Sequence, residues 1–165
     1  GIEPVELDVT DDASVARLVD HLAGRPVEVL MANAGGAYDG AAIADADVAS
    51  WLQAYDVNVV GVVRTVKALL PSLVASGAGT IVITGSTAGR IVYENGGSYT
   101  FAVNCFGGDQ ARAAKIYEGV AQPLTAQDIA EAARWAVMLP HHVNVDLMVL
   151  RPLAQAAQHK VHRVP

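Results

Sequence analysis

The stretch VEVLMANAGG at residues 27–36 decides the fold class of this 165-residue chain. Its first six residues, 27–32, are mostly apolar, as the buried strands of a parallel sheet are. Asn33, Ala34, Gly35 and Gly36 follow directly. Glycines just beyond the carboxyl end of such a strand let a ligand approach the backbone closely. Taken alone, this turn is also ordinary loop chemistry, and both interpretations stay open on these residues.

The pattern on both sides of this stretch alternates short apolar runs with longer helical periods, which predicts βαβ units and a parallel sheet. We expect strands at residues 5–9, 27–32, 80–84 and 145–150. We expect helices at residues 12–22, 47–76, 109–118 and 125–139. Capping residues precede the first and the last of these helices, and Pro71 is expected to bend the end of the second.

The composition excludes several classes of protein. Hydrophobic residues make up 52% of the chain and charged residues 17%, which rules out a disordered chain. A net charge of −6 offers no basic surface for nucleic acid or an anionic membrane. We expect no membrane span, because no apolar run approaches the roughly 20 residues that one needs. The single cysteine, Cys105, fits a reducing compartment, so we expect a cytoplasmic protein.

Three further side chains lie at predicted strand ends or close behind them. Asp8 ends the first strand, where an acidic side chain can hydrogen-bond a nucleotide base or ribose, whereas a helix cap explains only the later aspartates. Ser86 follows the strand at 80–84, and Tyr99 comes thirteen residues later. A pair of hydroxyls at this edge of a sheet can hold a carbonyl oxygen. Each of these residues alone is more simply a loop residue.

Together with Asn58 in VNVVG at residues 57–61, these motifs occur in an order that resembles the classical short-chain dehydrogenase/reductase family from about residue 6 to residue 99. The resemblance implies an α/β fold with a Rossmann-like, doubly wound parallel sheet in a single domain at 1–165. Three later segments look like the branch of NADP-dependent 3-hydroxy acid (serine-type) dehydrogenases: residues 106–110, 124–132 and 139–145.

The resemblance also implies a role for each motif. In the cofactor site, Asp8 and Val9 would flank the adenine ring, and Asn33, Ala34 and Gly35 would line the ribose side. In catalysis, Asn58 would hold a water in a proton relay, Ser86 would bind the substrate oxygen, and Tyr99 would exchange a proton during hydride transfer. The implied cofactor is NADP or NAD, with NADP favoured by the branch. The implied partners are a small alcohol or carbonyl substrate, such as a 3-hydroxy acid, and further copies of the chain in a dimer or tetramer.

The sequence departs from the family pattern in two places. The family has a lysine four residues after the tyrosine, and here that position is Val103. The Gly-rich phosphate turn after the first strand and the region following the tyrosine are absent, so the fold looks incomplete. Either the sequence joins parts of a longer protein at about residues 100/101, or it is a shortened homologue. We favour the first interpretation, because a parallel sheet without these strands would expose long edges.

Other interpretations are weaker on these residues. His141 with His142, or His159 with His162, could ligate a metal, but no cysteine or carboxylate cluster supports them, and we expect no metal site. Cys105 has no partner motif for a nucleophile. A non-catalytic dinucleotide-binding or scaffold homologue without the lysine is the alternative function. A reductase acting on a 3-ketoacyl thioester or a sugar is the alternative within enzymes.

Overall fold

The computed structural model describes residues 2–39, 41, 43–87, 117–157 and 160–164 of the chain. By their internal contacts these residues fall into two parts. The first part comprises residues 1–36 and 49–84, and the second comprises residues 37–48 and 85–165. Each part is described by itself.

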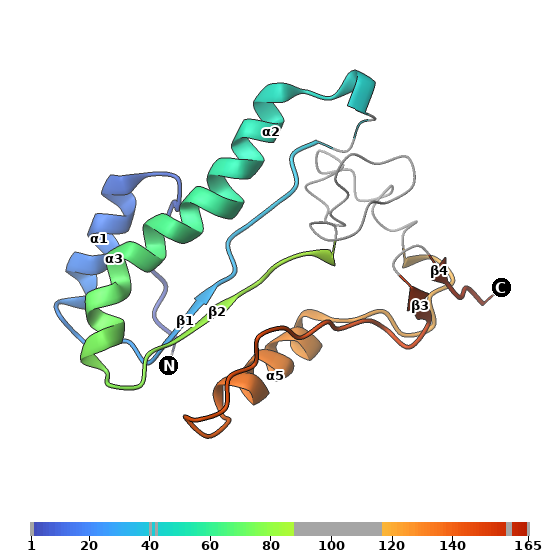
Figure 1. The fold of residues 1–165 in the computed structure, drawn as a ribbon. Helices are drawn as coiled ribbons and strands as arrows, with labels where there is room; N and C mark the ends of the chain where they lie inside the picture. The colour runs from blue at the N-terminus through green and yellow to red at the C-terminus, as the bar shows by residue number, and fades with distance from the viewer. Residues whose placement is uncertain (1, 40, 42, 88–116, 158–159, 165) are drawn as a thin grey trace. The chain divides into compact units, whose positions relative to one another are not determined.

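The first part contains a parallel pair of strands joined by a long helical connection (Figure 1). Strand β1 pairs with β2 so that Val29 lies opposite Thr80 and Ala32 lies opposite Ile83. A parallel pair with a helical crossover is the βαβ unit that the sequence predicts. The elements in chain order are α1 (Asp12–Leu22), β1 (Val29–Ala32), α2 (Val48–Tyr55), the π-helix η2 (Asp56–Val60), α3 (Gly61–Ala75) and β2 (Thr80–Ile83).

Helix α1 confirms the predicted helix at residues 12–22, and local chemistry explains both its ends. The Asp11 carboxylate accepts hydrogen bonds from the backbone N–H groups of Ala13 and Ser14, which have no partner inside the helix. The helix ends at Ala23, which adopts the left-handed conformation with φ of 48°. Between these ends Val15 is 2% exposed and belongs to the core of this part.

The predicted helix at residues 47–76 is also confirmed, although a π-helical segment interrupts it at Asp56–Val60. Helix α3 lies against both α1 and β1, and its residues Leu69 and Leu73 are each 4% exposed. α3 continues through Pro71 to its end at Ala75. The bend expected at Pro71 stays a prediction.

By length and composition alone, the stretch Val48–Ala75 is long and apolar enough to cross a membrane, with a mean hydropathy of 1.5. The expectation that no segment reaches this threshold was therefore wrong. The mostly buried core helices of soluble proteins are equally long and apolar, whereas only 22% of this apolar stretch is buried. In this helix Arg64 forms ion pairs with Asp12 and Asp56, and the helix packs on α1 and β1.

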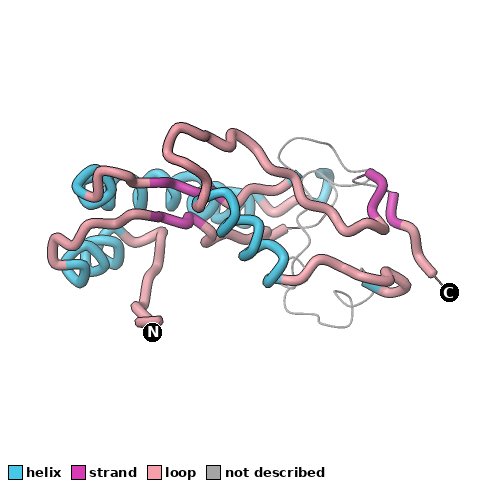
Figure 2. Tube along the Cα trace, turned by 90° about the horizontal axis from the view of Figure 1, so that it is seen from below, coloured by secondary structure: helices cyan, strands magenta, loops and turns pink. Residues whose placement is uncertain are grey.

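The second part contains η1 (Ile43–Asp45), α5 (Ala126–Val137), β3 (Gln155–Ala157) and β4 (Lys160–Val161). The predicted start of α5 is confirmed, because Thr125 and Asp128 form a full capping box. Strands β3 and β4 form an antiparallel pair close to the C-terminus, shown in magenta in Figure 2. The sequence does not predict this pair, because the segment is polar and lacks a clear alternation of apolar residues.

Two strand predictions were wrong. Residues 5–9 and 145–150 are not strands, although both carry the expected apolar residues. A strand is defined by its ladder of hydrogen bonds to a neighbour, and neither segment pairs with another strand among the residues that the structure describes. The predicted helix at residues 109–118 lies outside the described residues except for its last two positions.

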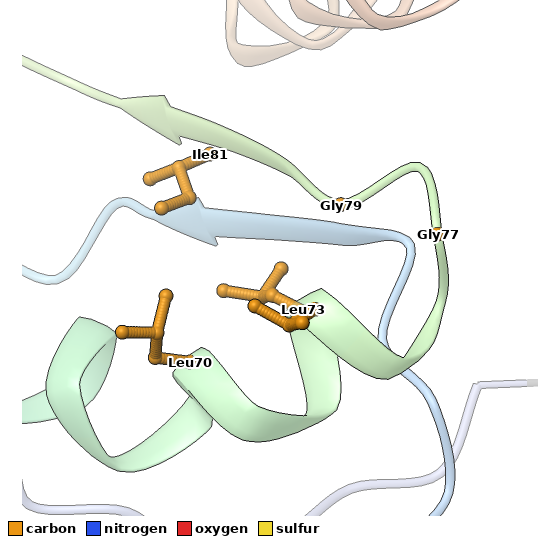
Figure 3. A pocket seen from close by; sticks show the side chains of 6 residues that line it. Leu70, Leu73, Gly77, Gly79 and Ile81 are labelled. Carbon is orange, nitrogen blue, oxygen red and sulfur yellow. The ribbon is translucent and has the colours of Figure 1, made fainter.

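A shallow hollow opens beside the start of β2 (Figure 3). It is lined by residues without polar side chains: Leu70, Leu73, Val74, Gly77, Gly79 and Ile81. Ligands of open α/β sheets bind at the carboxyl ends of the strands, whereas this hollow lies at the amino end of β2. The hollow is therefore at the wrong end of the strands for a ligand site of this fold.

Candidate cofactor-binding and active site

The carboxyl edge of the parallel pair carries the first group of predicted site residues. Beyond the last strand residues, the backbone N–H of Thr84 still donates to the carbonyl of Ala32 over 3.1 Å. β1 and β2 therefore end side by side, and β1 leads directly into the loop at residues 33–36. Asn33 and Ala34 are exposed in this loop. Their position at the carboxyl edge is the one at which open α/β sheets bind ligands.

Asn58 is the residue that fixes this loop. The backbone N–H of Gly36 donates to Asn58 Oδ1 over 2.9 Å, and Asn58 Nδ2 donates to the carbonyl of Gly36 over 2.7 Å. Asn58 is the central residue of the π-helix at Asp56–Val60, and single π-helical turns inside α-helices occur frequently at functional sites. The side chain thus joins the helix to the loop that follows β1.

Gly35 lies too close to this side chain for any other residue to replace it without movement. A Cβ atom built on Gly35 would lie 2.8 Å from Asn58 Oδ1. The loop and the helix therefore approach each other at van der Waals contact, and the glycine in the motif is a requirement of this approach. Its backbone stays open on the side away from Asn58, since Gly35 itself is exposed.

Asp8 is an exposed carboxylate held by its neighbours. The side-chain hydroxyl and the backbone N–H of Thr10 donate to Asp8 Oδ1 over 2.7 and 2.8 Å, and Asp8 N donates to Ser14 Oγ over 2.9 Å. The hydrogen bonds from Thr10, the side-chain one first, hold the pKa of the Asp8 carboxyl below its ordinary value, and the nearby Arg64 charge acts in the same direction. The carboxylate is therefore ionised and able to accept a hydrogen bond.

Val9 contacts two residues of helix α3. A Cβ on Gly61 would lie 2.8 Å from Val9 Cγ2, so the valine side chain packs directly on the helix backbone. One turn further along, Arg64 Nη1 donates to the carbonyl of Val9 over 2.5 Å. The segment that carries Asp8 and Val9 is thus fixed by the same helix that fixes the loop at residues 33–36.

The structure does not test the rest of the predicted catalytic set. Ser86 comes two residues after Thr84, is exposed, and belongs to the second part of the chain. Tyr99, Val103 and Cys105 lie outside the described residues. Among the residues that the structure describes, no group of three or more His, Cys, Asp or Glu side chains could hold a metal ion.

Two contributors to this site were missed at the sequence level. The backbone of Gly36, rather than a side chain, is the partner of Asn58. Arg64 was not singled out at all, although it falls with Asn58 and Gly61 at positions i, i+3 and i+6. Residues three apart are neighbours on a helix surface, so Gly61 adjoins both Asn58 and Arg64, and this spacing is the signal that could have linked the three residues.

A comparison with known protein families identifies the family of this chain. The sequence model of the family described as short chain dehydrogenase matches residues 1–108 of the chain. The chain therefore belongs to the short-chain dehydrogenase family, and its α/β fold is the Rossmann-like fold of that family.

Individual relatives and solved structures show which members of the family this chain is similar to. An uncharacterized oxidoreductase of Mycobacterium tuberculosis is 37% identical over an alignment of 150 positions. The alignment covers 70% of this chain and 59% of that protein. The NADP-dependent 3-hydroxy acid dehydrogenase YdfG of Salmonella typhi is 30% identical over an alignment of 197 positions. The alignment covers 96% of this chain and 79% of that protein. Among solved structures, the closed form of serine dehydrogenase complexed with NADP+ is 29% identical with a TM-score of 0.78, and 96% of this chain and 79% of that one are covered.

The chain is shorter than these relatives. It spans 59% of the length of the Mycobacterium tuberculosis protein. The 3-hydroxy acid dehydrogenase and the serine dehydrogenase each match 96% of this chain, and their names are those of the branch that the C-terminal segments of the sequence resemble.

Proposed function

We propose that the protein is an NADP-dependent oxidoreductase that interconverts a secondary alcohol and a ketone, with a small 3-hydroxy acid as its substrate. The observation that carries this proposal is the double attachment at residues 56–64 of the long helix. Asn58 fixes the loop after β1, and Gly61 and Arg64 fix Val9 beside Asp8. Two separate loops are thereby held for a ligand at the carboxyl edge, and the NADP-dependent relatives support the choice of ligand.

The residues of the first part fit a dinucleotide. The exposed, ionised carboxylate of Asp8 can accept a hydrogen bond from the exocyclic amino group of adenine, and the half-buried Val9 offers an apolar surface to the ring. Asn33, Ala34 and Gly35 present an exposed backbone, without a side chain at Gly35, to the ribose side. The nicotinamide, when bound, supplies the hydride acceptor or donor.

Asn58 is proposed to act through its backbone. Both polar atoms of its side chain are engaged by Gly36, so the relay water is better held by a carbonyl of the π-helical segment. A π-helical turn displaces the regular hydrogen-bond ladder, as the donation from Gly61 N to Asp56 O shows. Displacement of the ladder releases a carbonyl to accept a hydrogen bond from water.

Ser86 and Tyr99 complete the proposed chemistry. Ser86 holds the substrate oxygen, and the Tyr99 hydroxyl gives a proton to it during ketone reduction or removes one during alcohol oxidation. A phenol titrates near pH 10 and needs a nearby cation to act as a base at neutral pH. Val103 cannot supply that charge.

A segment absent from this sequence is proposed to supply the cation. The alignment with the 3-hydroxy acid dehydrogenase extends over 197 positions, more than the 165 residues of the whole chain, so the relative has residues inside the aligned span that this sequence lacks. This supports a segment missing from within the sequence, and we propose that the junction lies at about residues 100/101 within a single domain. We further propose, from the resemblance, a cytoplasmic homo-oligomer.

Two measurements test this function. Intact mass of the natural protein decides whether it exceeds the mass of the printed sequence. Turnover of 3-hydroxy acids is then followed through the absorbance of reduced nicotinamide, with NADP+ and NAD+ compared. Binding of NADPH without turnover across hydroxy acids, 3-ketoacyl thioesters and sugars would favour the non-catalytic alternative. Turnover of a thioester or a sugar instead would contradict the proposed substrate.

A further inference from the structure

Arg64 is held at a junction of three segments. Its Nη1 donates to the backbone carbonyl of Val9, and its Nε lies 2.6 Å from Asp12 Oδ1 in the first turn of α1. Its Nη2 lies 3.6 Å from Asp56 Oδ1 at the start of the π-helix. The three nitrogens of the guanidinium thus face three different partners, which only arginine can serve at once.

The arginine is committed to these protein contacts. Its side chain is 18% exposed, and two carboxylates balance its single charge. A guanidinium with this environment has no spare charge for a phosphate of a bound ligand. What it acts on is the backbone of Val9, a residue whose side chain already rests on Gly61.

We propose that Arg64, together with Gly61, is a positioning residue that sets Val9 and Asp8 for the adenine end of the dinucleotide. This inference rests on the proposed function. Without the guanidinium the carbonyl of Val9 loses its partner, and the segment at residues 8–10 is released from α3. The loop at residues 33–36 keeps its own attachment through Asn58, so the ribose side next to it is unaffected.

The proposal predicts a loss of binding that is selective for the adenine half. In the full-length protein, Arg64→Met should weaken binding of both NADPH and NADH by about tenfold. Binding of reduced nicotinamide mononucleotide, which has no adenine, should not change. The matched control is Lys67→Met. Lys67 is exposed and lies one turn after Arg64 on the same helix, so this variant also removes one positive charge. This control should bind all three ligands as the natural protein does.

Gly61→Ala is the second variant, and it perturbs Val9 without removing any charge. Gly61 has φ of −60°, so alanine suits its backbone and the variant should fold. The new Cβ displaces Val9, and the same selective loss should follow. Arg64→Lys, which retains the charge and one donor, should recover part of the affinity.

Fluorescence titration of the three reduced ligands gives the dissociation constants. Folded Arg64→Met or Gly61→Ala protein with unchanged NADPH and NADH affinity would overturn the proposal. A loss confined to NADPH would also overturn it, because Arg64 would then be a ligand of the 2′-phosphate. An equal loss of affinity for reduced nicotinamide mononucleotide would overturn the proposal as well, because the effect would then not be selective for the adenine half. Failure of the unsubstituted protein to bind any nicotinamide ligand would instead refute the proposed function, and the positioning role with it.

Discussion

Asn58 and Gly36 are joined by two hydrogen bonds that run in opposite directions, although 22 residues separate them in the chain. This pair ties the centre of a π-helical turn to the loop that follows β1. The helix therefore fixes the position of the loop, and the same helix holds Val9 through Gly61 and Arg64.

Replacing Asn58 by alanine should remove both hydrogen bonds and free the loop at residues 33–36. Because the site is solvent-exposed, water can satisfy Gly36, and we expect a loss of about 1–2 kcal/mol in the free energy of unfolding. Urea denaturation of the variant and the natural protein measures the difference. An unchanged midpoint would show that the pair does not stabilise the folded chain.

Replacing Gly35 by alanine should also destabilise the protein, because the new Cβ would lie 2.8 Å from Asn58 Oδ1. The two substitutions act on one contact and should not be additive. In an Asn58→Ala background, where the obstructing oxygen is gone, Gly35→Ala should cost less than it does alone. A double-mutant cycle in urea tests this, and equal costs in both backgrounds would place the strain elsewhere.

The pKa of Asp8 should respond to Thr10. The Thr10 hydroxyl donates the hydrogen bond that contributes most to lowering the pKa, and Thr10→Val removes it while retaining the backbone donor. The pKa of Asp8 should therefore rise towards its ordinary value. Carboxyl carbon NMR through an acid titration measures this. An identical titration curve in the variant would assign the lowered pKa to another group.

The sign of the pH effect follows from the lowered pKa. A carboxyl with a folded pKa below its unfolded one stabilises the fold above the unfolded pKa, and this contribution is lost as the pH falls through the folded pKa. The Asp8 contribution is thus constant above about pH 5. Dinucleotide affinity should share this behaviour, with a decline only in stronger acid that begins at higher pH in Thr10→Val.

The capping box of α5 should contribute to the stability of the second part of the chain. Thr125 accepts from the backbone N–H of Asp128, and the Asp128 carboxylate accepts from the backbone N–H of Thr125. Thr125→Ala should lower the Tm by roughly 3 °C, whereas Thr125→Ser should not. Cofactor affinity should be equal in all three proteins. Loss of affinity in Thr125→Ala would link this helix to the site.

Local signals in the sequence predicted local structure correctly. The caps at Asp11 and Thr125 give each helix start from a few adjacent residues, and both helices are confirmed. The strands at Val29–Ala32 and Thr80–Ile83 are confirmed within one or two residues of the predicted ends. Their apolar runs are typical of parallel-sheet strands, although in the structure exposed and half-buried residues alternate along both strands.

Pairing between distant segments was not predictable in the same way. The apolar run at 145–150 has the composition of a strand, but composition does not supply a partner. Strands β3 and β4 form a ladder although their sequences lack the apolar pattern of a strand. In the site, Asn58 was identified from its motif, while its partner Gly36 contributes only backbone atoms and Arg64 belongs to no motif.

The most direct test of the account is the effect of Tyr99→Phe in the full-length protein on NADP+-dependent oxidation of 3-hydroxy acids. The account predicts that the natural protein reduces NADP+, and that the variant loses a factor of about 10²–10⁴ in kcat. Its affinity for NADPH should stay the same, because the phenol hydroxyl moves a proton and does not hold the dinucleotide. Equal kcat in both proteins would contradict the account, as would a natural protein that reduces neither NADP+ nor NAD+.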